Sequence, residues 1–405
     1  MSDWKKIKIS DLGKVITGNT PPRKNPELYG VHTIFIKPTD VSEEEKYTYN
    51  PEECYSESGF NKYRNSLIPK GSTCVVTIGS IGKKMTKAHC DCFINQAMNA
   101  VVPNEYYDEE FVFYVLRYNL VQLKTLDSGT ASGRENVSKS SFSNINLLVP
   151  TEKKIQYKIG SILSSYDDLI ENNLKRIKLL EESAQRTYEE WFVKFRVNGE
   201  LLPIDEKTGL PMGWERKKLN DFVNIVSGFP FKSSEYVDDG QFKIVTIKNV
   251  QDGYFVPITN DTLVEIPQKV KKVQVLETGD IILSLTGNVG RVCLVYGDNY
   301  LLNQRVAKLI PNEKSSSGFI YFTMRNDKMI TTLENISNGA AQQNLSPINM
   351  GNVEVVYPDE ITVTKFNKLS DTAVMQICQL YILNQKLKES RDILLPKLMN
   401  GTIKV

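Results

Sequence analysis

The sequence predicts an α+β protein with an internal two-fold repeat. Two similar heads, mixed and β-rich with short helices, alternate with two long helices that pair as an antiparallel coiled coil. Three observations predict this: two long helix-forming runs, short β-branched runs between turn residues, and motifs that recur at a nearly constant offset. The expected order is head 1 (1–150), a central long helix (151–196), a linker (197–213), head 2 (214–358) and a C-terminal long helix (359–405).

The central helical run contains no proline and is rich in Leu, Ile, Glu, Lys and Arg from Ser161 onward. Steps of four and three between core positions are typical of a coiled coil. The expected seam consists of Tyr166, Ile170, Asn173, Ile177, Leu180, Ala184 and Trp191, with Asn173 as its polar member. At 1.5 Å per residue, a helix of about 40 residues is roughly 60 Å long, too long to bury its seam in one small domain. It therefore needs a second long helix.

The C-terminal run supplies that partner. Its expected seam is Phe366, Ala373, Ile377, Leu380, Asn384, Leu387, Arg391, Leu394 and Leu398. A buried Asn in such a seam weakens packing but fixes register and partner. The alternative is that both runs are ordinary amphipathic helices of separate domains, although few globular helices run so long without caps. The carboxylates of Asp167 and Asp168 are interpreted as part of the solvated helix face.

The first head contains short runs typical of strands: HTIFIK, TCVVTIG, NAVVP and NLLVP. Between them, Asp108–Lys124 has helical periodicity. This order indicates a compact mixed domain and not a series of βαβ units.

The second head repeats the first. Trp214 follows Trp4 by 210 residues, and further on the offset settles at 208. The matches at 208 include Gly71 with Gly279, Gly79 with Gly287, Gly82 with Gly290, Asn95-Gln96 with Asn303-Gln304, Asn136 with Asn344, and Pro150 with Pro358. Matches spread over this range indicate that one half of the chain duplicates the other.

Composition places the chain among ordinary globular proteins. It has 50 basic and 48 acidic residues, a net charge of +2, so its surface is not uniformly charged for nucleic-acid binding. If the chain binds DNA, its basic residues must be local or a partner must add surface, and binding by the chain alone should be weak. There is no signal-peptide pattern and no apolar run of membrane-spanning length, which predicts a cytoplasmic protein. Six scattered cysteines do not suggest a disulfide scaffold.

Motifs for catalysis or metal binding are weak. His89, Cys90 and Cys92 lack a second ligand pair at zinc-site spacing, so no metal is expected and the cluster is assigned to a strand or turn. The Gly79–Thr86 loop lacks the first glycine of a P-loop, because Thr77 stands there. With two histidines in the chain, imidazole chemistry has few candidates. We expect no catalytic residue.

Several motifs together are similar to the specificity subunit of type I restriction–modification systems. They are Gly209–Trp214 (GLPMGW), the paired loops TIGSIG and LTGNVG, the Asn-Gln that follows each, the central EEWFVKF and the ending LLPKLMNGTIKV. The resemblance covers essentially the whole chain. It implies two target-recognition domains that each read one half of a split DNA sequence, and a non-catalytic subunit.

The resemblance also implies partners and their cofactors. The helical spacer would set the distance between half-sites and dock DNA adenine methyltransferase subunits, two in the expected assembly. Those subunits would bind S-adenosylmethionine, and restriction subunits that join would use ATP and Mg²⁺. This chain itself would hold no cofactor.

The loops of both heads carry residue types that suit DNA. Lys and Arg neutralise phosphates or pair with guanine, and Asn or Gln pairs with adenine. The candidates in head 1 are Thr20, Arg23, Lys24, Lys37, Thr39, Asp40, Ser80, Lys83, Lys84, Ser132, Arg134 and Asn136. In head 2 they are Phe231, Lys232, Ser233, Lys248, Asn249, Asn288, Arg291, Gln342, Gln343 and Asn344. The alternative for each is an exposed loop side chain without a DNA role.

The framework matches between the halves, but these loops differ, which predicts an asymmetric target with an undefined stretch between its halves. The four paired-loop glycines are expected to form turns. Asn95-Gln96 and Asn303-Gln304 are expected to satisfy backbone groups. A different class of function is a two-headed module on a coiled-coil rod that binds protein or glycan. A neighbouring methyltransferase gene would favour the DNA hypothesis, and an enzyme acting alone lacks the required motifs.

Overall fold

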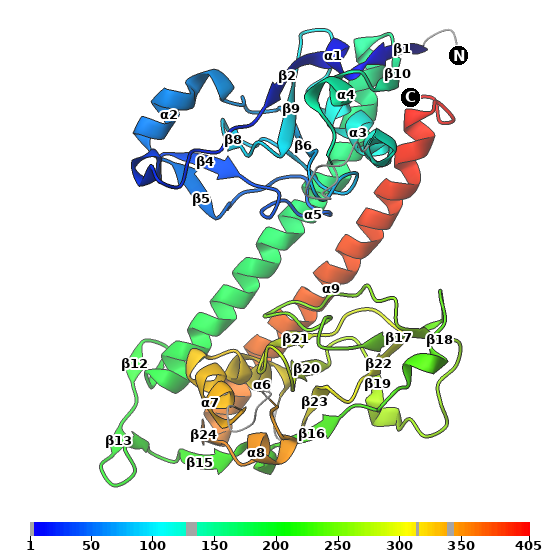
Figure 1. Cartoon of the computed structure of the whole chain (residues 1–405). Coiled ribbons are helices and arrows are strands. Elements are labelled where there is room, and N and C mark those ends of the chain that lie inside the picture. The colour runs from blue at the N-terminus through cyan, green and yellow to red at the C-terminus, as the bar shows by residue number, and fades with distance from the viewer. Residues whose placement is uncertain (1–3, 127–135, 313–315, 338–343) are drawn as a thin grey trace. The chain divides into compact units, whose positions relative to one another are not determined.

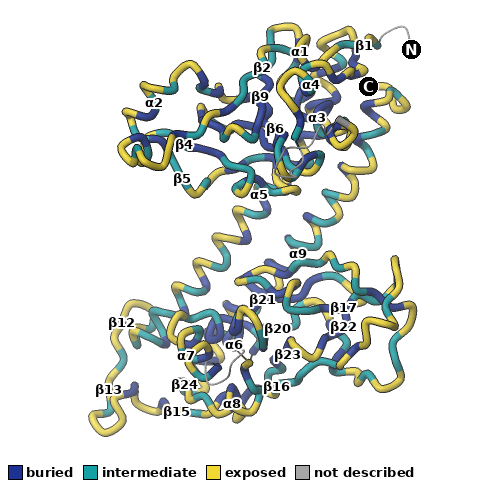
Figure 2. Tube along the Cα trace, viewed as in Figure 1, coloured by how far each residue is buried: buried dark blue, intermediate teal, exposed yellow. Residues whose placement is uncertain are grey.

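The computed structural model describes residues 4–126, 136–312, 316–337 and 344–405 (Figure 1). The chain forms two compact units, unit 1 (Met1–Glu171 with Lys386–Val405) and unit 2 (Asn172–Gln385). Each unit consists of one head and a segment of both long helices. The inner strands of each head are largely buried, as Figure 2 shows.

Head 1 contains three sheets. Strand β1 (Trp4–Lys8) pairs with β10 (Asn146–Pro150). An antiparallel sheet has the order β2 (Gly13–Thr17), β9 (Met98–Pro103), β6 (Thr73–Val76) and β7 (Met85–Lys87). A mixed sheet has the order β3 (Tyr29–Gly30), β5 (Glu53–Tyr55), β4 (Thr33–Ile36) and β8 (Phe93–Ile94), with β4 and β8 parallel. Its helices are α1 (Ile9–Leu12), α2 (Glu57–Tyr63), α3 (Glu109–Asn119) and α4 (Lys139–Ser143).

Head 2 has the same plan. Strand β15 (Glu215–Lys218) pairs with β24 (Glu354–Tyr357). The antiparallel sheet is β16 (Val223–Ser227), β23 (Val306–Pro311), β20 (Ile281–Ser284) and β21 (Val292–Leu294). The mixed sheet is β18 (Thr262–Leu263), β17 (Phe242–Val245), β22 (Tyr300–Leu302) and β19 (Val275–Leu276). The helices are α6 (Ser317–Met324), α7 (Asp327–Ser337) and α8 (Pro347–Gly351). Small two-stranded sheets, β11 (Arg196–Val197) with β12 (Glu200–Leu201) and β13 (Ile204–Asp205) with β14 (Leu210–Pro211), form the linker.

The register of the strands confirms the sequence repeat. In the parallel pair of head 1, Ile36 lies opposite Ile94, and in head 2 Val245 lies opposite Leu302. The heads differ at one edge of the mixed sheet. In head 2, Leu276 of β19 pairs with Tyr300 of β22, whereas the matching residues of head 1, Ile68 and Cys92, form an isolated bridge. The framework is therefore shared, and the two heads differ at its margins.

Matched glycines constrain the loop that follows β2 in head 1 and β16 in head 2, which we call the first loop of each head. A Cβ atom on Gly18 would lie 2.1 Å from the carbonyl oxygen of Ile94, and one on Gly228 would lie 2.2 Å from that of Leu302. No side chain fits at that separation, so the close approach of two backbones requires glycine. Each first loop is thereby held against the loop that carries the Asn-Gln pair.

The two long helices are α5 (Lys153–Tyr188), which continues as a π-helical turn at Glu189–Val193, and α9 (Glu360–Met399). In unit 2, Asn173 Nδ2 donates to Asn384 Oδ1 at 2.8 Å, while further along α5 the ring of Tyr188 lies 6.0 Å from that of Phe366. The partner on α9 thus moves toward its N-terminus as α5 advances. The antiparallel pairing of these helices is confirmed, with the predicted asparagines opposite each other.

In unit 1 the seam differs from the expectation. Tyr166 is only half-buried, whereas Leu163 and Asp167 are buried. On α9, Leu387 and Leu394 are partly buried and Leu395 takes the core position. An α-helix drifts relative to a strict heptad, because 3.6 residues per turn do not match a repeat of 3.5. Extrapolating the heptad therefore shifted the predicted seam by one residue.

The assignment of Asp167 to the solvated face is wrong, because the residue is 5% exposed. Its carboxylate forms an ion pair with the guanidinium of Arg391, which is 1% exposed, and accepts a hydrogen bond from Tyr114 Oη. Burial alone would lower the pKa of Arg391, but Asp167 and Asp392 more than offset this and raise it. Arg391 therefore stays charged, and Asp167 is its main counter-ion. Asp168 does lie on the exposed face.

Replacing Asp167 with Ala should strongly destabilise unit 1, because Arg391 would stay buried without its main counter-ion. Breaking a buried pair from one side costs about 3–5 kcal/mol, and we expect the lower end because Asp392 Oδ1 still accepts from Arg391 Nε at 2.9 Å. Denaturant unfolding followed by circular dichroism measures this. The control is Asp168→Ala, whose side chain is 61% exposed; it lies 3.6 Å from Lys46 Nζ, but Lys46 keeps its nearer partner Glu110 at 2.8 Å, so stability should change by less than about 1 kcal/mol. Equal effects of both substitutions would contradict the assignment.

Candidate DNA interface

In each head, the loop that contains the paired glycines (Gly79 and Gly82, or Gly287 and Gly290) lies beside the loop that ends at Asn136 or Asn344. Ile78 forms an isolated backbone bridge with Asn136 in head 1, and Thr286 forms the same bridge with Asn344 in head 2. The glycines of these loops have positive φ angles, +90° and +71° at Gly79 and Gly82, +75° and +82° at Gly287 and Gly290. Their role as turn formers is thus confirmed.

The asparagines of the Asn-Gln loops have the structural role that the sequence suggested, whereas Gln304 is exposed. Asn95 Oδ1 accepts from the Ala97 amide at 2.8 Å, and Asn303 Oδ1 accepts from the Arg305 amide at 3.2 Å. Asn95 Nδ2 donates to Thr20 Oγ1 at 2.8 Å, which ties the first loop to this one. The structure therefore brings Thr20 together with the Asn-Gln loop.

Two of the predicted DNA-binding residues close matching turns. Asp40 Oδ2 accepts from the Lys37 amide at 2.8 Å, and Asn249 Oδ1 accepts from the Thr246 amide at 2.9 Å. Asn249 is 2% exposed and also donates to the carbonyls of Val256 and Ile258. Its hydrogen-bonding groups are engaged within the fold, so we assign Asn249 to the framework and not to base recognition.

Several other candidates have partners inside their own head. Phe231 is 9% exposed and packs in an apolar cluster of head 2. Arg23 lies 2.7 Å from a Glu53 carboxylate oxygen, although its side chain is 68% exposed. Lys37 Nζ lies 2.5 Å from Glu52. These ion pairs reduce the charge that Arg23 and Lys37 can present to a phosphate.

The remaining candidates differ in how open they are. Lys84 Nζ donates to the Pro38 carbonyl at 3.1 Å, and Arg291 Nη1 donates to Gln251 Oε1 at 2.6 Å. Exposed candidates are Lys24, Thr39, Lys83, Lys232, Ser233, Lys248, Asn288 and Asn344, and Ser80 and Asn136 are half-buried. Ser132, Arg134, Gln342 and Gln343 lie outside the described residues.

A basic groove in head 1 was not predicted. It has a volume of about 450 Å³ and is lined by three lysines, Lys14 on β2, Lys62 on α2 and Lys139 at the start of α4, together with Asn19, Asn65 and Ser66. In the described part of this head, no carboxylate lines it. Among the described residues, none of the three lysines forms an ion pair. We call these three residues the lysine patch, and their chemistry suits phosphate oxygens.

Head 2 has a groove that shares two repeat positions with this one and is otherwise lined by other parts of the framework. It has a volume of about 480 Å³ and is lined by Ser227, Thr286, Gln304, Arg305 and Asn344, among others. Ser227 matches Thr17, which lines the groove of head 1, and Pro347 matches Lys139. An arginine and two amides can form bidentate hydrogen bonds with base edges. The two grooves thus occupy one framework but differ in chemistry.

The sequence could not reveal the lysine patch, because its members lie far apart in the chain. Lys14 on β2, Lys62 on α2 and Lys139 on α4 come to one groove only in the folded head. For the groove of head 2 the sequence did offer a signal, because Arg305 directly follows the Asn-Gln pair that had been assigned to the framework.

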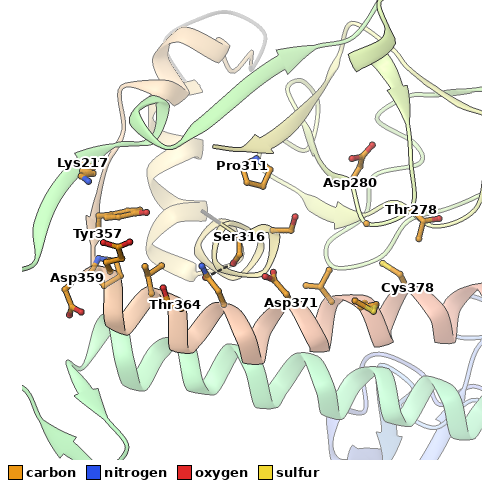
Figure 3. Close-up of a pocket in the computed structure, with 18 of the residues that line it drawn as sticks. Lys217, Thr278, Asp280, Pro311, Ser316, Tyr357, Asp359, Thr364, Asp371 and Cys378 are labelled. Carbon is orange, nitrogen blue, oxygen red and sulfur yellow. Dashed lines mark hydrogen bonds between the residues drawn. The ribbon is translucent and has the colours of Figure 1, made fainter. Parts of the chain in front are cut away.

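A larger groove in unit 2 has the wrong charge for DNA. It has a volume of about 1160 Å³ and lies along the first part of α9, where Figure 3 shows Lys217, Tyr357 and Asp371 around it. Five carboxylates line it, Glu215, Asp280, Asp359, Glu360 and Asp371, against the single lysine. Asp359 caps α9 by accepting from the Thr362 amide at 2.9 Å and from Trp214 Nε1 at 2.8 Å. This acidic groove would repel phosphates.

Metal chemistry finds no support in the described part of the chain. His89, Cys90 and Cys92 lie in a turn, as expected, and within the described ranges no group of three or more His, Cys, Asp or Glu could hold a metal. A hydrogen bond with Cys74 and burial raise the pKa of the Cys92 thiol, so it stays protonated. Burial lowers the pKa of His89, which is therefore neutral near pH 7. In the described part, no helix has the length and apolarity needed to span a membrane.

The lysine patch predicts a specific change in salt dependence. Replacing Lys14, Lys62 and Lys139 with Ala together should lower the slope of log affinity against log salt by about three, at roughly one per lost phosphate contact. Titration of duplex DNA by fluorescence anisotropy between about 50 and 200 mM salt measures the slope. The matched control removes three exposed lysines of the same unit, Lys6, Lys154 and Lys158. The patch has no DNA role if both triple variants lose the same slope.

Comparison with known proteins agrees with the fold. Residues 1–182 and 211–371 match the family model described as type I restriction modification DNA specificity domain. The MjaIX specificity subunit of a type I restriction enzyme from Methanocaldococcus jannaschii is 27% identical over 100% of this chain and 94% of its own length. The HindI specificity subunit from Haemophilus influenzae is 25% identical over 73% of this chain and 77% of its own.

The fold has a solved counterpart. The crystal structure of the S subunit of a type I restriction–modification system from M. genitalium aligns with a TM-score of 0.59 and 19% identity. The alignment covers 98% of this chain and 96% of that one. At this identity the likeness concerns the fold.

Proposed function

Since this chain belongs to the family of type I restriction–modification DNA specificity subunits, which are non-catalytic DNA-recognition subunits, we propose that its two heads read different halves of one DNA target. The observation that carries the proposal is that groove-lining positions of the repeated framework hold different side chains in the two heads: Lys14 and Lys139 match Asn224 and Pro347, and Arg305 matches Ala97. Head 1 offers lysines there, and head 2 offers Arg305 with amides. Different groove chemistry on one framework supports an asymmetric, bipartite sequence.

Within each head, the proposed roles follow from side-chain chemistry. Lys14, Lys62 and Lys139 anchor phosphates, which positions the head without reading sequence. Arg305, Gln304 and Asn344 in head 2 are the proposed base readers, because Arg pairs with guanine and amides pair with adenine in the major groove. The exposed Lys24, Lys83, Lys232 and Lys248 extend the basic surface of their own heads. Family membership supports DNA as the ligand over the protein or glycan of the alternative hypothesis.

We propose that the helical rod sets the gap between the half-sites. The segment of α5 between the heads is continuous helix, as is that of α9, so the number of helical residues is a fixed length. A helix rises 1.5 Å per residue, and duplex DNA rises about 3.4 Å per base pair. Seven residues therefore correspond to about three base pairs.

Methyltransferase subunits are the proposed partners on α9. In unit 2, four apolar side chains of this helix remain exposed: Ile361 at 68%, Leu369 at 45%, Met375 at 60% and Leu383 at 45%. At 3.6 residues per turn they fall within about a third of the helix circumference, away from the buried seam. Exposed polar side chains, among them Lys368, Thr372 and Gln379, lie between them, and a face that mixes apolar and polar groups in this way suits a protein interface. The methyltransferase would supply S-adenosylmethionine chemistry, and restriction subunits that join would supply ATP-dependent functions.

The spacer proposal is tested by lengthening the rod. One heptad is inserted in α5 after Glu171 and one in α9 after Gln385, at the boundary between the units. The chain is expressed with its methyltransferase, and N6-methyladenine is mapped by single-molecule sequencing. We expect unchanged half-sites and a gap longer by about three base pairs. The control insertion goes into the turn at 206–209 and should leave the gap as it is; an unchanged gap in the rod variant would exclude this role.

The exposed apolar side chains of α9 make a second prediction. Changing Leu369 and Met375 to Glu should weaken methyltransferase binding by about tenfold to a hundredfold, because burying one such side chain contributes about 1.5–3 kcal/mol. Binding is measured by titrating the full chain with purified methyltransferase in a calorimeter. The control is Val264→Glu, an apolar residue of head 2 with 67% exposure. Undiminished affinity of the α9 variant would move the docking site elsewhere.

A further inference from the structure

The two polar pairs of the coiled coil break its internal symmetry. The helices repeat with an offset of 207 residues, since α5 begins at Lys153 and α9 at Glu360. This offset carries Asp167 onto Val374 and Arg391 onto Ala184. In the same way it carries Asn173 onto Leu380 and Asn384 onto Ile177.

The counterparts of all four polar residues are apolar and buried. Val374 is 5% exposed, Ala184 1%, Leu380 7% and Ile177 3%, and all belong to the core of unit 2. In a symmetric duplication, the two related positions along the helix pair would hold the same pair of residues. This chain instead has an ion pair in unit 1 where the repeat has Ala184 and Val374, and an asparagine pair where it has Ile177 and Leu380.

This asymmetry matters when identical halves meet. If two copies of the C-terminal half paired through α9 in the same antiparallel register, Arg391 of each would face Val374 of the other. If two N-terminal halves paired through α5, Asp167 would face Ala184 and Asn173 would face Ile177. Each arrangement leaves a charge buried without its counter-ion, and such a group is strongly destabilising.

The size of the side chains at the helix ends also disfavours the pairing of identical halves. Leu395, Leu398 and Met399 of α9 complete the core of unit 1. Their counterparts on α5 are Tyr188, Trp191 and Phe192, of which Tyr188 and Phe192 are buried in the core of unit 2. A pair of N-terminal halves would place these aromatic side chains where head 1 holds Leu and Met, and overpacked cores are destabilised.

We propose that the Asp167–Arg391 ion pair and the Asn173–Asn384 hydrogen bond select the partner of each long helix, so that a half carrying α5 pairs only with a half carrying α9. The partner that fits the surface of either helix is the complementary half, from this chain or from a second copy. A buried asparagine pair is known to fix register and partner in coiled coils, and the ion pair adds a charge requirement. The heads would then assemble in mixed and never in matched pairs.

The experiment uses the complete chain, cut after folding. A protease site is inserted between Lys207 and Thr208, in an exposed turn, and the folded protein is cleaved there. The halves are separated in denaturant, refolded together by dilution, and counted by native mass spectrometry. We expect mixed complexes to exceed complexes of two identical halves by about a hundredfold. A wild-type sample with identical-half complexes in comparable amounts would overturn the proposal.

Variants isolate the polar pairs by giving each polar position the residue that stands at the matching place in the other helix. Asp167→Val with Arg391→Ala should raise the fraction of identical-half complexes at least about tenfold. Asn173→Leu with Asn384→Ile is the second variant, which changes no charge and should act in the same direction. Circular dichroism of the uncut chains checks that both variants fold. If folded variants reassort as the wild type does, the polar pairs do not choose the partner.

Discussion

A helix that extends beyond its own domain must bury its apolar seam against another part of the protein, and the rest of this structure depends on that constraint. Neither α5 nor α9 can bury its seam inside its own head, so each completes the core of a unit to which the other also contributes. Ile177, Ala184 and Tyr188 of α5 lie in the core of unit 2, and Leu395 and Leu398 of α9 lie in the core of unit 1. Head, rod and opposite helix are therefore interdependent in stability, because loss of either seam exposes the core of a head.

The sequence predicted those features that depend on local chemistry or on repetition. Asn173 and Asn384 interrupt two heptad seams, and that alone placed them at core positions where they now hydrogen-bond. The glycines at 79, 82, 287 and 290 were predicted as turns because each half repeats them, and their φ angles are positive. Repetition was informative because it separated the framework from the loops without any knowledge of tertiary contacts.

Features that depend on distant partners escaped prediction. Asp167 was assigned to solvent because a carboxylate on a helix usually is solvated. Its burial depends on Arg391 and Tyr114, from distant parts of the chain. Asn249 was a candidate base reader by residue type, yet the carbonyls that it satisfies, those of Val256 and Ile258, become neighbours only when the turn closes. Residue type alone could not decide between these roles.

The near-neutral net charge is an average over surfaces of opposite character. The basic groove of head 1 has three lysines and no carboxylate, whereas the groove along α9 has five carboxylates and one lysine. Elsewhere acidic groups are consumed within the fold, as where Glu110 lies 2.6 Å from the buried Lys87 and 2.8 Å from the buried Lys46. A phosphate backbone responds to the local field within a Debye length of about 8 Å, and not to the sum over the chain. A neutral chain can therefore carry a locally basic surface in head 1, whatever the charge of its other surfaces.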